Sequence, residues 1–243
     1  MKQINNSAII LAGGKGVRMQ SDLPKVLHPL RDKPLISYVV ESLHKADISA
    51  ITVVVGYKGE MVMSALENDD ITFVWQHEQL GTGHAVMQAE DIYKNYSGNI
   101  IIACGDVPLI MPNTFKKLQT SSLQENVKAV VLTMNVADPT GYGRVVKDEN
   151  GAFLRIVEHK DANESEKQIT EVNTGTYIFD NEFLFKGLSQ INTNNAQGEY
   201  YLPDALHYVL ENNFIVDTVL LEDPMEGTGI NTKEELLKLE KRI

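Results

Sequence analysis

The chain has 243 residues, of which 43% are hydrophobic and 23% charged, a composition typical of a folded globular protein rather than a disordered one. Its 22 basic and 33 acidic side chains give a formal charge of −11, which argues against general nucleic-acid binding. The single cysteine, Cys104, excludes an intramolecular disulfide and argues against a structural zinc site. No apolar run approaches the ~20 residues of a membrane-spanning helix, and the N-terminus does not resemble a signal peptide. We therefore expect a cytoplasmic protein without membrane partners.

The first half of the chain alternates short apolar runs with amphipathic segments. Runs of apolar and β-branched residues predict strands, and apolar residues at helical spacing predict helices. Strands are expected at residues 7–11, 51–55, 71–76, 100–103 and 129–135. Helices are expected at residues 35–43, 60–66, 83–89 and 113–118. This alternation predicts an α/β fold with a Rossmann-like, mostly parallel sheet flanked by helices.

The second half is less regular. Residues 144–147 and 153–157 flank Asn150 and Gly151, a pair that is typical of a β-hairpin turn. Further strands are expected at residues 172–179 and 215–221, and helices at residues 204–210 and 232–241. We interpret this half as an extension of the sheet with a small inserted lobe, so that residues 1–243 form a single domain.

A glycine-rich turn follows the first predicted strand, in the segment LAGGKGVRM at residues 11–19. Ligands of parallel sheets bind beyond the carboxyl ends of the strands, where glycines let backbone amides approach phosphate oxygens. Lys15, Arg18 and Lys25 add the positive charge that an acidic protein needs at a phosphate site. The spacing matches neither a P-loop nor a dinucleotide fingerprint. By itself, the turn is equally compatible with a tight bend that carries solvated basic residues.

With Pro24 and Lys25 included, the loop is similar to the L-A-[AG]-G-x-G-x-R-M…P-K signature of sugar-1-phosphate nucleotidyltransferases. Seven later segments resemble one family in the order in which that family has them. They are QHEQLGTGHA (76–85), GDVPL (105–109), DPTGYGR (138–144), VEHKDA (157–162), VNTG (172–175), NNAQGEYY (194–201) and GIN (229–231). The family is the uridylyltransferase domain of the bacterial bifunctional UDP-N-acetylglucosamine pyrophosphorylase/glucosamine-1-phosphate acetyltransferase. The resemblance covers nearly the whole chain.

The resemblance implies the nucleotide-diphospho-sugar transferase fold, with sugar binding in the small lobe. It implies transfer of UMP from UTP to N-acetylglucosamine 1-phosphate with Mg²⁺, a step toward peptidoglycan precursors in cell-wall biogenesis. The implied nucleotide-binding residues are Leu11, Ala12, Gly13, Gly14, Lys15, Gln76, Gly81 and Thr82. The implied catalytic residues, which meet the phosphates, are Arg18 and Lys25. The implied metal ligands are Asp106 and Asn231, and the implied sugar-binding residues are Gly105, Gly143, Glu158 and Asn173.

The chemistry of these side chains agrees with the implied roles. Uracil has two carbonyl acceptors and one N–H donor, which a glutamine amide such as that of Gln76 and backbone groups can match. Mg²⁺ accepts a few protein oxygens and completes its shell with water and substrate phosphates. A phosphate monoester has a second pKa near 6, so the sugar phosphate needs no general base at neutral pH.

The chain also departs from the family pattern. Family members usually continue into a left-handed β-helix that transfers an acetyl group, whereas this chain ends at Ile243, so we expect no acetyl transfer. The oligomeric state stays open because that β-helix forms the family's trimers. Cys104 stands where the family commonly has tyrosine, and Gly13 and Val17 replace a frequent alanine and threonine.

Two other functions are compatible with the sequence. One is the same chemistry on another nucleoside triphosphate and hexose 1-phosphate. The other is a non-catalytic sensor of sugar nucleotides. The joint presence of Lys25, Asp106 and Asn231 argues against a sensor, because a protein that only binds has no need of a metal pair.

Overall fold

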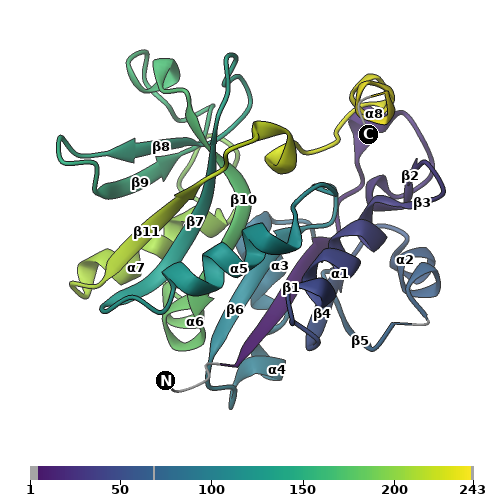
Figure 1. The fold of residues 1–243 in the computed structure, drawn as a ribbon, viewed down its shortest axis with the longest axis horizontal. Helices are drawn as coiled ribbons and strands as arrows, with labels where there is room; N and C mark the ends of the chain where they lie inside the picture. The colour runs from purple at the N-terminus through teal and green to yellow at the C-terminus, as the bar shows by residue number, and fades with distance from the viewer. Residues whose placement is uncertain (1–4, 68, 242–243) are drawn as a thin grey trace.

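A nine-stranded sheet forms the centre of the computed structural model, which describes residues 5–67 and 69–241 (Figure 1). Seven strands lie side by side in the order β11 (Ile215–Leu220), β7 (Val127–Asn135), β10 (Glu171–Asp180), β6 (Asn99–Cys104), β1 (Asn6–Ala12), β4 (Ile51–Val55) and β5 (Ile71–Trp75). β6, β1, β4 and β5 pair in parallel. β10 runs antiparallel to β6 and β7. The sheet is therefore mostly parallel, as the sequence predicts.

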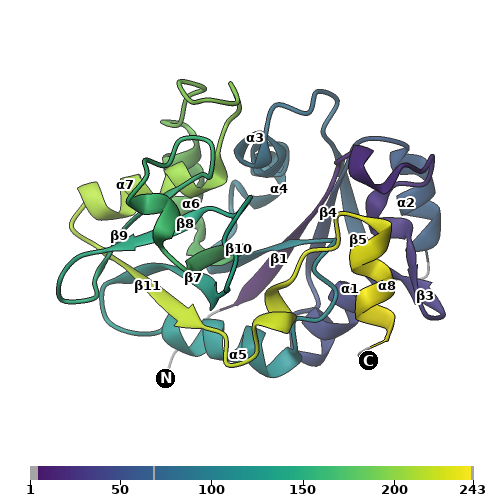
Figure 2. The same ribbon diagram turned by 90° about the horizontal axis from the view of Figure 1, so that it is seen from above.

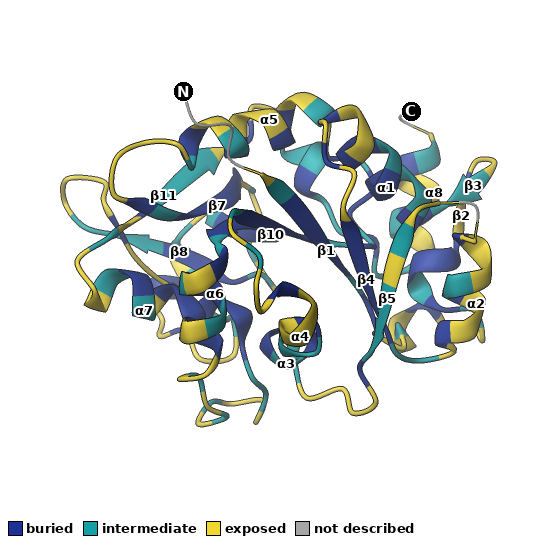
Figure 3. Cartoon of the chain, turned by 90° about the horizontal axis from the view of Figure 1, so that it is seen from below, coloured by how far each residue is buried: buried dark blue, intermediate teal, exposed yellow. Residues whose placement is uncertain are grey.

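Helices cover both faces of this sheet (Figures 2 and 3). On one face lie α1 (Leu35–Lys45), α2 (Gly59–Ala65) and α5 (Pro112–Ser121). On the other lie α3 (Thr82–Met87), α4 (Glu90–Tyr93), α6 (Asn181–Leu188) and α7 (Leu206–Glu211). Successive residues of β1 point to opposite layers, so Ile10 packs in the first core and Ile9 in the second. This two-sided burial explains why the central strands read as continuous apolar runs.

The predicted hairpin is formed by β8 (Arg144–Lys147) and β9 (Phe153–Val157), which extends the sheet from β10. Its turn is closed by Asp148, whose Oδ1 accepts hydrogen bonds from the backbone amides of Asn150 and Ala152. Gly151 has a φ of 84°, in the left-handed region that favours glycine. The hairpin is thus an extension of the nine-stranded sheet, in the half of the chain where the sequence analysis expects a small lobe.

The C-terminal segment returns from the β11 edge to the opposite side of the molecule (Figure 1). It ends in α8 (Lys233–Glu240), which lies beside the short strands β2 (Pro29–Leu30) and β3 (Lys33–Pro34). A separate apolar cluster holds it there, formed by Met19, Leu30, Leu35, Ile230, Leu236 and Leu239. The crossing brings residues 228–232 next to the carboxyl end of β6, where the Ile230 amide donates to the Asp106 carbonyl at 2.9 Å.

The predicted elements are found with small differences at their ends. The helix expected at residues 204–210 begins as a 3₁₀ turn (Leu202–Ala205) and continues as α7, because Pro203 favours a tight first turn. α4 and α6 are the helices that the sequence pattern did not predict. Within the described residues, no helix combines the length and apolar character needed to cross a membrane.

Candidate active site

Lys25 begins a 3₁₀ turn (Lys25–Leu27) directly after Pro24. The glycine loop packs against it: Gly16 has a φ of 63°, and a Cβ at this position would lie 2.6 Å from the Cβ of Lys25. Glycine at position 16 thus meets two requirements, the left-handed backbone and the close approach. Met19, the last residue of the 3₁₀ turn that follows Gly16, is buried in the apolar cluster with Leu30 and Leu35 and so fixes this turn.

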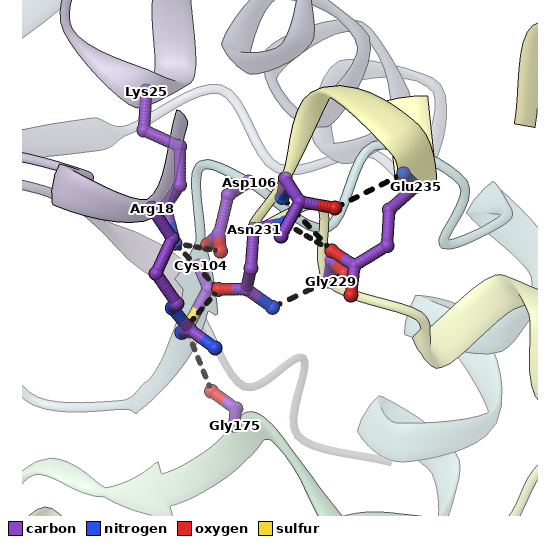
Figure 4. Close-up of polar contacts among 9 residues, drawn as sticks. Arg18, Lys25, Cys104, Asp106, Gly175, Gly229, Asn231 and Glu235 are labelled. Carbon is purple, nitrogen blue, oxygen red and sulfur yellow. Dashed lines mark hydrogen bonds and ion pairs between the residues drawn. The ribbon is translucent and has the colours of Figure 1, made fainter. Parts of the chain in front are cut away.

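Two oxygens from distant parts of the chain converge on the Lys25 ammonium (Figure 4). Its Nζ donates to Asp106 Oδ2 at 2.5 Å and to Asn231 Oδ1 at 3.2 Å. Arg18 Nη2 donates to the same Asn231 oxygen at 2.8 Å. The side chains of Lys25 and Asp106 are only 19% and 16% exposed, so solvent screens their ion pair less than a surface pair. The structure thus brings together the four residues expected to bind phosphate and metal.

The Asp106 and Asn231 oxygens that contact Lys25 are also of the kinds that bind a divalent cation. Asp106 supplies a carboxylate and Asn231 an amide oxygen, the hard ligands that Mg²⁺ prefers. Both already contact a single positive charge, that of Lys25. Within residues 5–67 and 69–241, no group of three or more His, Cys, Asp or Glu side chains is placed to hold a metal. A metal bound here would take its remaining ligands from substrate phosphates and water.

Gln76 lies against the glycine loop at the carboxyl end of β5. It is 4% exposed, and its Nε2 donates to the Gly81 carbonyl at 3.1 Å. A Cβ on Gly13 would lie 2.8 Å from Gln76 Oε1, so the absence of a side chain at position 13 lets the amide approach the loop backbone. Gly13, Gln76 and Gly81 therefore gather at one place, as expected for parts of a nucleotide site.

The loop around Gly81 and Thr82 is held by the segment at residues 194–201. The Gly83 amide donates to the Tyr200 carbonyl at 2.8 Å, and the Tyr200 amide donates to the Leu80 carbonyl at 2.8 Å. A Cβ on Gly81, whose φ is 112°, would lie 2.6 Å from the Tyr200 carbonyl oxygen. The segment thus fixes the start of α3 through its backbone.

A cavity of about 330 Å³ adjoins the Lys25 cluster. Seven of the residues that the sequence assigns to the site line it: Leu11, Thr82, Asp106, Gly143, Glu158, Asn173 and Asn231. The cavity has the size of a small-molecule site and joins the proposed metal ligands to the proposed sugar-binding residues. Its lining comes from both halves of the chain, so the fold must form before the cavity exists.

Glu158 is the ionisable group most affected by this cavity. Burial and, to a smaller extent, the charges of Asp204, Asp161 and Glu199 together raise the pKa of its carboxyl group to about 7, with Arg144 acting in the opposite direction. Gly143 gives the carboxylate its room, because a Cβ there would lie 3.1 Å from Glu158 Oε1. At neutral pH, the carboxyl group therefore exists in both protonation states.

Asn173 shapes the cavity wall through internal hydrogen bonds. Its Nδ2 donates to the Tyr177 hydroxyl at 2.6 Å, and its Oδ1 accepts from the Gly175 amide at 3.0 Å. The strand bulges between Asn173 and Tyr177, where Gly175 has a φ of 80°. Cys104 faces this bulge, with its Sγ 3.6 Å from the Gly175 carbonyl oxygen. Burial, reinforced by Asp106, raises the thiol pKa of Cys104 to about 12, so the thiol is neutral.

The remaining predicted residues lie in the backbone around the site. Gly105 continues the pairing of β6 with β1 by one more hydrogen bond, which its amide donates to the Leu11 carbonyl at 3.0 Å. Ala12 is buried at the end of β1, and Gly14 is exposed with open space around it. The Lys15 ammonium lies over the Tyr57 ring, 5.4 Å from its centroid.

Sequence reasoning did not identify several residues that line the cavity, among them Tyr142, Thr174, Tyr177, Leu202 and Pro203. Their side chains carry no charge and form no metal-ligand or catalytic pattern, so the sequence alone did not distinguish them from structural residues. For Tyr142 and Thr174 a signal was available, because they lie within the matched segments 138–144 and 172–175.

A larger hollow of about 900 Å³ lies at the other end of the sheet, between α4 and α6. Gly98 lines it, directly before the amino end of β6, whereas Asp106 follows the carboxyl end. In parallel sheets, ligands bind at the carboxyl ends of strands, so we assign the site to the smaller cavity.

Comparison with known proteins shows which family this chain is similar to. The model of the nucleotidyl transferase family matches residues 7–221. The chain is similar to the bifunctional protein GlmU of Oceanobacillus iheyensis, with 46% identity over 98% of this chain and 52% of that protein. It is 45% identical to GlmU of Lactococcus lactis over 99% of this chain and 53% of that protein. GlmU of Bacillus cytotoxicus is 45% identical over 97% of this chain and 51% of that protein. The chain spans about half the length of the curated relatives it matches.

Proposed function

Because this chain belongs to the nucleotidyl transferase family, we propose that it transfers UMP from UTP to N-acetylglucosamine 1-phosphate. The products are UDP-N-acetylglucosamine and pyrophosphate. One observation carries the proposal: a single cavity is lined by Asp106 and Asn231, which both accept hydrogen bonds from the Lys25 ammonium, and by Glu158 and Asn173, which suit sugar hydroxyls. The resemblance of the loop segments to uridylyltransferases supports UTP and the acetylated sugar as the substrates.

The proposed reaction is an in-line displacement at phosphorus. An oxygen of the sugar phosphate forms a bond to the α-phosphorus of UTP, and the bond between this phosphorus and the bridging oxygen to the β-phosphate breaks. Pyrophosphate leaves with that electron pair. With a second pKa near 6, the attacking phosphate is mostly dianionic at neutral pH and needs no proton acceptor. Catalysis therefore depends on holding two polyanions together and stabilising charge on the α-phosphoryl oxygens.

The residues of the cation cluster suit this task. Lys25, held between the glycine loop and Asp106, offers a point charge at the place where the phosphates would meet. Arg18 is exposed at the mouth of the cluster, where its guanidinium can donate to two phosphate oxygens at once. The loop amides around Gly13 and Gly14 would bind the remaining phosphate oxygens.

The rest of the site selects the two substrates. Gln76, pressed against Gly13, would pair its amide with the uracil edge together with backbone groups. Glu158 and Asn173 would contact the sugar from the opposite wall of the cavity. Asp106 and Asn231 would hold Mg²⁺, which supplies positive charge to orient and neutralise the phosphates.

The test is pyrophosphate release with Mg²⁺, measured for four nucleoside triphosphates against several sugar 1-phosphates. We expect activity with UTP and N-acetylglucosamine 1-phosphate, and its loss when EDTA removes the metal. Activity confined to another pair would keep the chemistry and refute the substrate assignment, with the wall around Cys104 as the first place to look. A folded protein that binds UDP-N-acetylglucosamine but releases no pyrophosphate with any pair would refute the enzyme and favour a sensor.

A further inference from the structure

The two proposed metal ligands differ in how they are placed. Asp106 follows β6, a buried strand in the middle of the sheet, so its position is fixed by the core. Asn231 instead lies in the segment between β11 and α8, which pairs with no strand of the sheet among the described residues. The Asn231 side chain is held by its own hydrogen bonds, since Oδ1 accepts from Arg18 and Lys25 and Nδ2 donates to the Gly229 carbonyl at 3.4 Å. A further contact is needed to fix the backbone from which this side chain projects.

Glu235, in the first turn of α8, makes that contact (Figure 4). Its Oε2 accepts a hydrogen bond from the Asn231 amide at 2.6 Å and another from the Thr232 amide at 3.0 Å. Thr232 Oγ1 accepts in return from the Glu235 amide at 3.1 Å, which completes a capping box. A capping box requires the bond to Thr232 but not the bond to Asn231, so the second bond is an additional constraint.

The base of α8 is itself fixed relative to Asp106. Ile230 is 1% exposed and packs with Leu236 and Leu239 of the helix. Its backbone amide donates to the Asp106 carbonyl at 2.9 Å. Glu235 thus belongs to a helix that is anchored beside Asp106, and its carboxylate binds the backbone of Asn231.

We propose that Glu235 is a positioning residue for the metal site, whose carboxylate holds the Asn231 backbone so that Oδ1 of Asn231 and Oδ2 of Asp106 face the same cation. Charge-assisted bonds to two successive amides restrict rotation of the Asn231 backbone, and its side-chain oxygen moves with that backbone. Outer partners of this kind typically contribute about 10- to 100-fold to metal affinity. This inference rests on the proposed metal-dependent function.

Three variants separate positioning from simple stabilisation of α8. Glu235→Ala removes both bonds to Asn231 and Thr232, and Glu235→Gln keeps an oxygen acceptor without the charge. Thr232→Ala is the matched control, because it removes the other half of the capping box and leaves the bond to Asn231. The measurements are Mn²⁺ binding in the presence of UDP-N-acetylglucosamine, followed by the EPR signal of free Mn²⁺, and the unfolding midpoint of each variant.

We expect Glu235→Ala to weaken Mn²⁺ binding roughly 10-fold or more, Glu235→Gln to recover most of it, and Thr232→Ala to leave it unchanged while lowering the unfolding midpoint. The Mg²⁺ concentration for half-maximal pyrophosphate release should follow the same order. Equal loss of Mn²⁺ binding in Glu235→Ala and Thr232→Ala, or no loss in Glu235→Ala, would overturn the inference.

The outcome also distinguishes this inference from the proposed function. Wild-type protein that binds Mn²⁺ and releases pyrophosphate, with Glu235→Ala indistinguishable from it, refutes the role of Glu235 alone. Wild-type protein that releases no pyrophosphate with any substrate pair refutes the proposed reaction, whereas the comparison of Mn²⁺ binding among the variants still decides whether Glu235 orients Asn231. Wild-type protein that binds no Mn²⁺ overturns the inference as well.

Discussion

Lys25 donates to both Asp106 and Asn231, so its charge lies where the phosphates are proposed to meet. We expect Lys25→Ala to lower kcat by roughly 10²–10³-fold, since removal of one donor that stabilises transition-state charge typically has an effect of this size. Steady-state pyrophosphate release measures it. Lys186→Ala is the matched control, because this lysine pairs with Glu182 on α6 and lies far from the site. Turnover of Lys25→Ala close to that of the control would remove Lys25 from the mechanism.

Glu158 should make sugar binding depend on pH. Its pKa of about 7 means that the carboxylate, the better acceptor for sugar hydroxyls, predominates only above pH 7. We expect KM for the sugar phosphate to fall as pH rises from 6 to 8, on the order of tenfold. The second ionisation of the sugar phosphate, with a pKa near 6, contributes to this profile in any variant. Glu158→Gln should therefore show only the smaller pH dependence of KM that comes from the sugar phosphate. If its KM changed with pH as in wild type, Glu158 would not contact the sugar as proposed.

The same carboxyl group should also make the free energy of unfolding depend on pH, and here the protonated form is the favourable one. Its pKa is raised from the ordinary 4.5 to about 7, so the folded state binds the proton more tightly than the unfolded state. The free energy of unfolding therefore falls as pH rises through this window and stays low above it. At pH 8, Glu158→Gln should be more stable than wild type by up to roughly 3 kcal/mol, and at pH 5 by much less. Denaturant titrations at the two pH values measure the difference.

Many residues that the structure gathers around the candidate site could be named from the sequence, because the loop segments carry glycines, amides and charges in a recognisable order. What the segments did not reveal was their mutual geometry. Lys25 and Asn231 are 206 positions apart, and only the crossing of the C-terminal segment brings them to 3.2 Å. The reason for Gly13 also required the structure: the absence of a side chain there admits the Gln76 amide. Glu235 could have been suspected as the end of a capping box, but its bond to Asn231 could not.

At the level of elements, strands were easier to predict than short helices. The central strands are buried on both faces, so their apolar runs stand out in the sequence. α6 was not predicted: the expected strand ended at residue 179, and the helix of eight residues follows β10 without a loop that would mark its start. Asp180 was the available signal, since it caps the helix by accepting from the Glu182 amide.

The bulge of β10 gives a prediction at this level. Gly175 has a φ of 80°, and a Cβ there would lie 3.0 Å from Cys104 Sγ. We expect Gly175→Ala to lower the free energy of unfolding by about 1–2 kcal/mol and to raise KM for the sugar phosphate, because the bulge forms the cavity wall. Denaturant titration and steady-state kinetics test both effects.

Gly151→Ala provides the matched control for that change. Gly151 has a nearly identical φ of 84°, but it lies in the β8–β9 turn with open space around it. Its substitution should cause a comparable loss of stability and leave KM unchanged. If both variants raised KM equally, the effect would come from general loss of stability and not from the cavity wall.

The molecule as a whole carries a formal charge of −11 and yet is proposed to bind two polyanions. The structure reconciles these facts by gathering Arg18, Lys25 and the glycine loop at the carboxyl ends of the central strands, where Arg18 and Lys25 face Asn231 and Asp106 (Figure 4). Screening over about 8–10 Å at moderate ionic strength limits repulsion from the distant surface charges, whereas the partly buried cluster is screened less. Local placement of charge thus matters more than the total.

Binding of a ligand that spans the cavity should stabilise the entire fold. The cavity is lined by Leu11 and Asp106 from the first half of the chain and by Glu158, Asn173 and Asn231 from the second, so it exists only while both halves are packed. UDP-N-acetylglucosamine with Mg²⁺, at 100 times its Kd, should add about 2.7 kcal/mol to the free energy of unfolding. For a chain of this size, that corresponds to a rise in Tm of roughly 5–10 °C.

Comparison of two ligands locates the sugar within the cavity. At pH 8 and equal concentrations, Glu158→Gln should reduce the thermal shift produced by UDP-N-acetylglucosamine and leave the shift produced by UTP and Mg²⁺ unchanged, because UTP is proposed to reach Gln76 and Lys25 and carries no N-acetylglucosamine to place at Glu158. A variant that keeps the full shift with both ligands would show that the sugar lies away from this wall. Loss of both shifts would show that Glu158 supports the nucleotide side, and the division of the cavity into two subsites would then be wrong.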